Sequence, residues 1–225
     1  MSASPPRPAG KFIAIEGVDG AGKGVQSRLL RDALLQCGVP VLLTREPGGS
    51  PGAEEIRGLL VSGSTDKWDS MTELLLVYAA RRSHLQQTIL PALAQGTWII
   101  SDRFADSSRA FQGIAGGLGL DVVERIHREV VGTLVPDLTL VLDLDAATSL
   151  ARTRQRGGGE DRFEKKGEDY QRKVRDGFRL LATRSPQTHQ LIDASGSVAV
   201  VAQALRQAVA ERLQLPALTT VAMPE

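Results

Sequence analysis

Short apolar runs alternate with longer amphipathic stretches along this chain. Five of the runs are too short for helices, and several are rich in Val or Ile: Phe12–Ile15, Val39–Thr44, Thr97–Ser101, Leu138–Leu144 and Gln190–Ile192. β-Branched residues in short runs of this kind are typical of buried strands. The pattern therefore predicts five strands.

Between and after these runs, apolar positions recur with the period of a helix. Helices are expected over Val25–Cys37, Glu73–Gln95, Val122–Val131, Ala146–Arg156, Gly167–Thr183 and Val198–Leu213. Alternating strands and helices predict right-handed crossovers in a parallel sheet. The nearly continuous apolar character of Leu138–Leu144 favours strands that are covered on both faces. The predicted fold is α/β: a three-layer, doubly wound, parallel five-stranded sheet.

Length and composition suit a single domain. The chain has 225 residues, of which 42% are apolar and 24% charged, and this is enough to bury one core. We expect that domain over residues 11–213. The Pro- and Ser-rich residues 1–10 and the weakly patterned residues 214–225 are expected to be flexible tails.

Charge and cysteine content indicate the cellular environment and the partners of the protein. Lys and Arg number 27 against 26 Asp and Glu, so no global field attracts nucleic acid or an anionic membrane. The single cysteine, Cys37, has no partner for an internal disulfide, and no apolar run is long enough to span a bilayer. We expect a soluble, cytoplasmic protein. His84, His127 and His189 do not have the spacing of metal ligands and are assigned no role.

A glycine-rich loop follows the first strand. Residues Gly17 to Gly24 read GVDGAGKG, which matches G-x-x-x-x-G-K. A strand, a glycine loop and a helix in this order point backbone N–H groups and a helix N-terminus at a phosphate, with Lys23 reaching the terminal oxygens. A turn alone would not require Lys23. The loop ends in Gly24 where Ser or Thr is usual, so a Mg²⁺ ion would depend on carboxylates such as Asp19 or Asp102.

Two more strand ends carry charged side chains. The third strand runs into Asp102-Arg103, an acid suited to metal-bound water beside a cation for a phosphoryl group. An ordinary surface ion pair is the alternative. After the second strand, Arg45 precedes a proline and two glycines, which let a backbone approach a ligand closely.

Arginines also gather around residues 152–165. Arg152 and Arg156 share a helix face, three glycines follow, and Arg162 comes next. Such a segment suits a lid that closes over transferring phosphates, although a solvated basic helix end would look similar. On the long helix, Tyr78 and Arg81 lie a turn apart and could offer packing and a guanidinium to a base, or simply belong to an amphipathic helix.

These motifs together resemble one family. In order, they are the loop at 17–24, TREPGG at 44–49, YAAR at 78–81, DR at 102–103, AFQG at 110–113, PDLTLVLD at 136–143 and the arginine-rich segment. The chain resembles thymidylate kinase of the bacterial type over residues 11–213. The resemblance implies a P-loop nucleoside monophosphate kinase fold, ATP and Mg²⁺ as cofactors, dTMP as the acceptor in dTTP synthesis, and a homodimer.

The resemblance and the residue patterns together assign roles by position. The ATP site comprises Gly17, Val18, Asp19, Gly20, Ala21, Gly22, Lys23, Gly24, Arg152 and Arg156. The acceptor site comprises Asp19, Arg45, Tyr78, Arg81, Arg103, Ser107, Ser108, Phe111, Gln112, Phe163 and Glu164, with Arg45 and Arg103 on the phosphate and Arg81 at the thymine edge. Catalysis is assigned to Asp19, Lys23, Asp102, Arg103, Arg156 and Arg162, and Mg²⁺ to Asp19, Asp102 and Glu164.

Three positions depart from the family pattern. They are Gly24, Val77 where an aromatic residue normally stacks on thymine, and Phe111 where a Tyr commonly abuts the deoxyribose. The last two favour a second hypothesis, a related kinase that acts on another monophosphate, and Gly24 favours a third, a non-catalytic nucleotide-binding protein. A GTPase switch is excluded because its Asn-Lys-x-Asp guanine reader needs asparagine, which this sequence lacks.

Overall fold

The computed structural model describes residues 10–156 and 162–221, with Gln155 and Arg156 described in their backbone only. Five strands form one parallel sheet in the order β2-β3-β1-β4-β5, which confirms the predicted α/β class. The strands are β1 (Phe12–Gly17), β2 (Val41–Arg45), β3 (Trp98–Asp102), β4 (Leu138–Asp143) and β5 (His189–Asp193).

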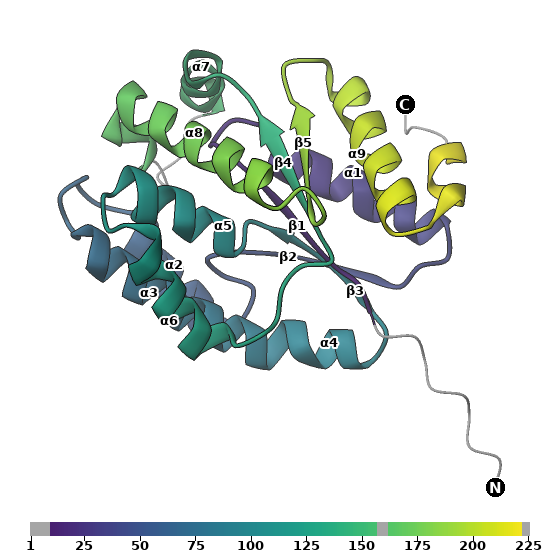
Figure 1. The fold of residues 1–225 in the computed structure, drawn as a ribbon, viewed down its shortest axis with the longest axis horizontal. Coiled ribbons are helices and arrows are strands. Elements are labelled where there is room, and N and C mark those ends of the chain that lie inside the picture. Colours follow the sequence, from purple (N-terminus) through teal and green to yellow (C-terminus); the bar gives the residue numbers. More distant parts are fainter. Residues whose placement is uncertain (1–9, 157–161, 222–225) are drawn as a thin grey trace, which may run out of the picture.

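Helices cover both faces of the sheet, as a three-layer fold requires (Figure 1). Helices α1 and α9 lie together on one face, and α3, α5, α6 and α8 lie on the other. The α-helices are α1 (Lys23–Gln36), α2 (Pro51–Val61), α3 (Ser70–His84), α4 (Leu90–Ala94), α5 (Ala105–Ser108), α6 (Leu120–Val131), α7 (Ala146–Arg156), α8 (Glu168–Arg184) and α9 (Val198–Arg212).

The central strand β1 is buried along its whole length. Successive side chains of a strand point to opposite faces, so Phe12 and Ala14 join one apolar cluster while Ile13 and Ile15 join another. The edge strand β2 is mostly half-buried or exposed. This two-sided burial explains why β1 and β4 read as continuous apolar runs in the sequence.

The predicted long helix is divided in the structure. Helix α3 starts at Ser70, where the Asp69 carboxylate accepts a hydrogen bond from the Thr72 backbone N–H at 2.6 Å. A π-helical turn, Leu85–Ile89, then leads into α4. Pro91 at the start of α4 has no N–H to donate to the preceding turn, and this accounts for the change in hydrogen bonding.

Two α-helices among the described residues were not predicted. Helix α2 follows Ser50 at the N-cap with Pro51 at the first helical position, a start signal that the sequence reading overlooked. Helix α5 continues into a π-helical segment, Arg109–Ala115. Both segments lie next to strand ends, so they build walls of the site described below.

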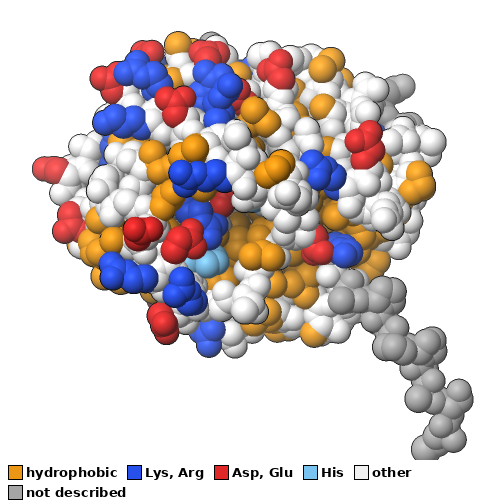
Figure 2. Space-filling model, viewed as in Figure 1, with side chains coloured by type: hydrophobic (Ala, Val, Ile, Leu, Met, Phe, Trp, Pro, Cys, Tyr) orange, Lys and Arg blue, Asp and Glu red, His pale blue; other side chains and the backbone are white. Residues whose placement is uncertain are grey.

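The outer surface carries charged and hydrophobic side chains in different regions. Figure 2 shows Lys and Arg interspersed with Asp and Glu, most densely at the upper left, and hydrophobic side chains around a hollow in the lower half of this face. Among the described residues, no helix has both the length and the apolar character needed to cross a bilayer.

The core extends beyond residue 213, the predicted end of the domain. A 3₁₀ helix, Pro216–Thr220, packs against α9, and Leu218 is fully buried in the main apolar cluster. Arg206 of α9 donates a hydrogen bond to the Val221 carbonyl at 2.8 Å. We therefore propose that residues 214–221 belong to the folded domain rather than to a flexible tail.

Replacing Leu218 by Ala should lower the free energy of unfolding by about 2–5 kcal/mol, because a buried leucine leaves a cavity. Urea denaturation followed by circular dichroism measures this change. The control is Val200→Ala, since Val200 on α9 is 60% exposed. Equal, small effects of both substitutions would contradict the placement of Leu218 in the core.

Candidate active site

A cavity of about 710 Å³ opens beyond the carboxyl ends of β1, β2 and β3. This is the edge of a parallel sheet at which ligands bind in such folds. Many of the residues assigned from the sequence line it: Asp19, Gly20, Gly22, Lys23, Gly24, Arg45, Arg81, Asp102, Arg103, Ser107, Ser108, Phe111, Gln112, Arg152, Phe163 and Glu164. The lining does not include Gly17, Val18, Ala21, Tyr78 or Arg162.

The glycine loop wraps the Lys23 ammonium group. Lys23 is the first residue of α1, and its Nζ donates hydrogen bonds to the carbonyls of Gly17 at 3.1 Å and Val18 at 2.8 Å. Burial and the nearby Arg103 cation lower the pKa of Lys23 to about 8. The loop thus places a cation and the N-terminus of α1 against one cavity, which is an anion-binding arrangement.

Two glycines of the loop differ in the space around them. At Gly20, with φ of 79°, an added Cβ would lie 2.5 Å from the Ser149 carbonyl oxygen, so a side chain cannot be accommodated there. At Gly24 an added Cβ would lie 3.5 Å from Asp102 Oδ2, an ordinary contact. A side chain at Gly24 would therefore be accommodated in contact with the Asp102 carboxylate, with the Arg28 guanidinium 3.8 Å from the added Cβ.

Asp102 and Arg103 meet the loop because β3 pairs with β1. Ile15 of β1 is in register with Asp102, which also pairs with Arg45 of β2. Arg103 donates to Asp19 Oδ1 at 2.6 Å and to the Gly17 carbonyl at 3.0 Å. The pKa of Arg103 is raised above its ordinary value. Burial alone would lower this pKa, but the negative charges of Asp19 and the other nearby carboxylates outweigh the effect of burial.

The backbone at Arg103 is strained. Its φ of 73° lies in the left-handed region, which costs a non-glycine residue of order 1–3 kcal/mol. The buried Glu16 carboxylate secures the turn that follows, accepting hydrogen bonds from the N–H groups of Phe104 at 2.8 Å and Ser107 at 3.1 Å. Burial and the neighbouring Asp106 raise the pKa of Glu16. Glu16 carries no motif signal, and the sequence reading missed it.

The opposite wall contains a buried arginine with fixed partners. Arg81 is 1% exposed and donates to Glu46 Oε2 at 2.7 Å, Ser108 Oγ at 3.1 Å and the Phe104 carbonyl at 2.9 Å. Glu46 also contacts His84 Nδ1 at 3.1 Å. The pKa of Glu46 is lowered below its ordinary value. Burial alone would raise this pKa, but Arg81 and His84 outweigh the effect of burial. These bonds engage all three guanidinium nitrogens and hold the Arg81 side chain in a fixed plane at the cavity.

Tyr78 does not reach the cavity. Its hydroxyl is hydrogen-bonded to His127 Nδ1 at 3.1 Å, and its ring lies 4.5 Å from the Arg81 guanidinium carbon. The neighbouring Val77 lines the cavity instead. The expectation that Tyr78 contacts the acceptor is thus not supported by its position, which makes it a support for Arg81.

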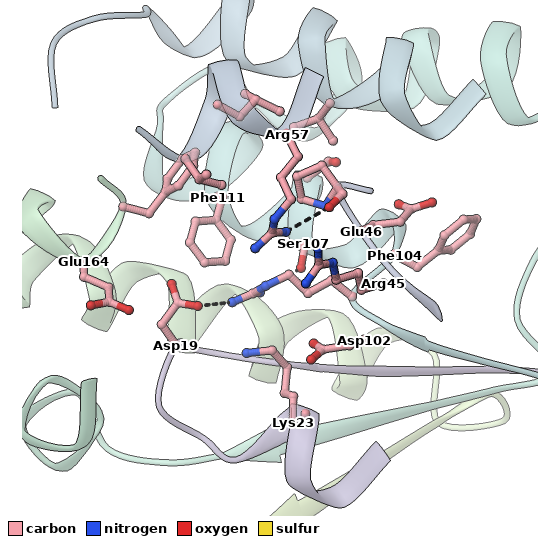
Figure 3. A pocket seen from close by; sticks show the side chains of 18 of the residues that line it. Asp19, Lys23, Arg45, Glu46, Arg57, Asp102, Phe104, Ser107, Phe111 and Glu164 are labelled. Atoms are coloured by element: carbon pink, nitrogen blue, oxygen red, sulfur yellow. Dashed lines mark hydrogen bonds and ion pairs between the residues drawn. The ribbon is translucent and has the colours of Figure 1, made fainter. Parts of the chain in front are cut away.

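Two more cations enter the cavity near β2. Arg45 is paired with Glu54 at 3.0 Å, and Arg57 of α2 donates to the Pro47 carbonyl at 2.8 Å. Figure 3 shows Arg57 reaching into the pocket from the side opposite Lys23. Arg57 was missed because α2 was not predicted. The capping pair Ser50-Pro51, with Arg57 in the helix that it starts, was the available signal.

Comparison with known proteins agrees with this geometry. The family model described as thymidylate kinase matches residues 15–205. The chain belongs to the thymidylate kinase family. Curated thymidylate kinases of Jannaschia sp. and Caulobacter vibrioides are 48% and 47% identical over 90% and 92% of this chain, which cover 97% and 99% of those proteins. A solved thymidylate kinase from Ehrlichia chaffeensis superposes with a TM-score of 0.74 at 31% identity, over 90% of this chain and 100% of that one.

The predicted lid arginines of this thymidylate kinase family member differ in position where their side chains are described. Arg152 lines the cavity, and its NH1 group lies 3.4 Å from the Ala194 carbonyl. The Arg156 side chain and residues 157–161 lie outside the described part of the chain. Arg162 is fully buried among carbonyl groups of the α2–α3 connection, so its predicted role at the transferring phosphoryl group is not supported by its position.

Glu46→Ala should lower the free energy of unfolding by about 3–5 kcal/mol, because it leaves the buried Arg81 cation without its partner. Glu54→Ala is the matched control: its pair with Arg45 is solvent-exposed and should contribute less than about 1 kcal/mol. Urea denaturation at neutral pH measures both. Similar effects of the two substitutions would contradict a structural role for the Glu46–Arg81 pair.

Proposed function

We propose that this protein transfers the γ-phosphoryl group of ATP to dTMP, giving ADP and dTDP for dTTP synthesis. The observation that carries the proposal is that one cavity holds both the Lys23 loop and the Arg81–Arg103 wall. Membership of the thymidylate kinase family supports both substrates. A donor and an acceptor that share one cavity can react directly.

On the donor side, the loop and the start of α1 bind the ATP phosphates. Lys23 exchanges its bonds to the Gly17 and Val18 carbonyls for phosphate oxygens, which are stronger partners for an ammonium group. Gly20 allows the loop to lie against the backbone of α7 at Ser149. Arg152 of α7 is placed to meet the same anion.

On the acceptor side, three guanidinium groups suit the monophosphate. All three line the cavity: Arg45 is the last residue of β2, Arg57 lies on α2 and Arg103 follows β3. The base lies deeper, where Arg81 and Gln112 offer N–H donors and Val77 offers an aliphatic surface. Ser107 and Ser108 lie on α5 between the phosphate and base regions.

Phe111 and Phe163 close the acceptor side. Their ring centroids lie 5.7 Å apart at an interplanar angle of 89°, and both residues line the cavity. Glu164 follows Phe163 and faces the Asp19 side of the pocket in Figure 3. We propose that these aromatic edges exclude water around the sugar, which protects the transferring phosphoryl group from hydrolysis.

The reaction is an in-line attack by an acceptor phosphate oxygen on the γ-phosphorus of ATP. The P–O bond to ADP breaks as the new bond forms, so no protein nucleophile is required. Lys23 and Arg103 share the charge that develops on the transferring group. Asp19 orients Arg103 through their ion pair of 2.6 Å.

Mg²⁺ fits the residues present. Asp102 lies beside Gly24 in the cavity lining, which also includes Asp19 and Glu164. Carboxylates, water and phosphate oxygens are the ligands that Mg²⁺ prefers, and the ion neutralises phosphate charge in phosphoryl transfer. Among the described residues, no three His, Cys, Asp or Glu side chains form one metal-binding group, so the predicted set of Asp19, Asp102 and Glu164 is not gathered around one ion. We propose Asp102 as the protein ligand, with water and phosphate oxygens as the others.

The acceptor preference is tested by measuring ADP release with ATP, Mg²⁺ and dTMP, dUMP, dGMP, dCMP or UMP in parallel. A strong preference for dTMP is expected. Preference for another monophosphate would make Val77 and Phe111 determinants of a different specificity. Lys23→Ala is the control: it should reduce turnover about a hundredfold or more while the fold is retained. Inactivity with every acceptor would contradict the proposed function.

We also propose that the protein is a homodimer, as the family resemblance implies, and that it is cytoplasmic, in line with its single cysteine. Helix α3 supports this proposal because Met71 and Leu75, one turn apart, are 37% and 53% exposed. Apolar side chains on one helix face are typical of subunit contacts. Sedimentation equilibrium would test it: a mass of one chain at micromolar concentration would contradict the dimer.

The pH dependence of kcat/KM for ATP should follow the protonation state of Lys23. Its pKa of about 8 means that the free protein carries the ammonium form below pH 8 and loses it above, while ATP stays fully ionised. Because the ammonium form binds phosphate, kcat/KM for ATP should fall as the pH rises above about 8. In Lys23→Arg this fall should disappear, since arginine keeps its charge. A flat wild-type profile up to about pH 9.5 would contradict the assignment.

Gly24→Ser should keep the fold, because its Cβ has space, and should lower the Mg²⁺ concentration needed for half-maximal activity. The new hydroxyl would stand beside Asp102, where it adds an oxygen ligand. Gly24→Ala, which adds the Cβ alone, is the matched control. Identical Mg²⁺ dependence in the serine and alanine variants would mean that carboxylates, water and phosphates already suffice.

A further inference from the structure

Arg162 is enclosed by the connection between α2 and α3. Its Nε donates to the Ser64 carbonyl at 2.9 Å, and its NH2 group donates to the carbonyls of Thr65 at 3.1 Å and Trp68 at 3.2 Å. A longer contact of 3.4 Å joins NH1 to the Leu60 carbonyl. The side chain is 0% exposed. A guanidinium used in this way binds backbone, not phosphate.

The charge of Arg162 is balanced by Glu73. The Arg162 NH2 group lies 2.8 Å from Glu73 Oε1, which also accepts from Lys166 Nζ at 2.7 Å. The second oxygen, Oε2, accepts from Gln112 Nε2 at 3.1 Å. Glu73 is fully buried on α3. One carboxylate thus connects the segment 162–166, helix α3 and the π-helical segment that contains Gln112.

The residues next to Arg162 form part of the acceptor wall. Phe163 and Glu164 line the cavity, and so do Leu60 and Gln112. A further hydrogen bond holds the backbone of Phe163, whose carbonyl accepts from Gln171 Nε2 at 3.0 Å. This part of the cavity wall is therefore assembled from separate chain segments. Glu73 contacts the 162–166 segment and Gln112, and Arg162 contacts the carbonyl of Leu60.

We propose that Arg162 and Glu73 are positioning residues for the acceptor nucleotide, which hold Phe163, Glu164 and Gln112 in the cavity, and that Arg162 does not act on the transferring phosphoryl group. The proposal rests on the proposed function, since it assigns part of the same site. Its physical basis is pre-organisation: a wall already fixed by buried charge-assisted bonds loses little freedom when the nucleotide binds.

The contacts of Arg162 depend on the shape of its guanidinium group as well as on its charge. A guanidinium donates in several directions within one plane, whereas an ammonium group is a compact point charge. Arg162→Lys therefore keeps the charge beside Glu73 but cannot reach the same set of carbonyls. The wall should loosen while the net charge of the site stays the same.

The test is steady-state kinetics of Arg162→Lys with dTMP and ATP varied separately, together with calorimetric titration of dTMP. We expect KM and Kd for dTMP to rise about tenfold or more, with KM for ATP and kcat at saturating dTMP near the wild-type values. A fall in kcat with unchanged affinity for dTMP would overturn the proposal, because it would place Arg162 at the transferring group. Unchanged kinetics would overturn it as well.

Two further variants separate positioning from general loss of stability. Arg206→Lys is the matched control, because Arg206 is also buried and donates to a backbone carbonyl, but lies on α9 outside the cavity. It should leave the KM for dTMP unchanged. Lys166→Met removes another partner of Glu73 and should raise the same KM, with an effect that is not additive to that of Arg162→Lys.

The kinetic results distinguish an error in the positioning proposal from an error in the proposed function. If the wild-type protein does not phosphorylate dTMP, the proposed function is wrong and the positioning proposal is overturned with it. If the wild type is active and Arg162→Lys shows unchanged dTMP affinity, only the positioning proposal is wrong. Lys166→Met keeps the test decisive if Arg162→Lys does not fold, since an unchanged KM in that variant would also contradict the role of Glu73.

Discussion

The pairing of β1 with β3 is the contact on which the site depends. Their register sets Asp102 beside Ile15, so the chain turns into Arg103 where the glycine loop leaves β1. The Arg103 N–H donates to the Ile15 carbonyl at 2.9 Å, and its guanidinium bonds Gly17 and Asp19 of the loop. A shift of two residues along the strands would separate the phosphate loop from its acid and its arginine.

Buried carboxylates keep this arrangement in place. Glu16 holds the strained turn after Arg103, Glu46 holds Arg81, and Glu73 holds Arg162. Each lies in the interior, where leaving a partner unpaired is costly, so each gives one wall of the cavity a single geometry. The cations that face the ligands are thereby oriented before any nucleotide binds. This pre-organisation is what an enzyme needs to stabilise charge in a transition state.

The sequence predicted the sheet and much of the cavity because both follow from local patterns. Buried strands read as apolar runs, and the residues after them, such as Lys23 and Arg103, lie at the carboxyl edge by topology alone. Glu16, Glu46 and Glu73 could not be predicted, since their partners are distant in the chain and no spacing marks them. Arg162 was misplaced for the same reason: its neighbours suggested a solvent-facing lid, while its partners lie about a hundred residues earlier.

We propose that ATP and the acceptor bind in one cavity and react directly, without a protein nucleophile. It is tested most directly with ATP made chiral at the γ-phosphorus by oxygen isotopes, followed by analysis of the configuration of the β-phosphorus in the dTDP formed. A single in-line displacement predicts inversion. Retention would require two displacements through a phosphorylated residue of the protein and would rule out direct transfer.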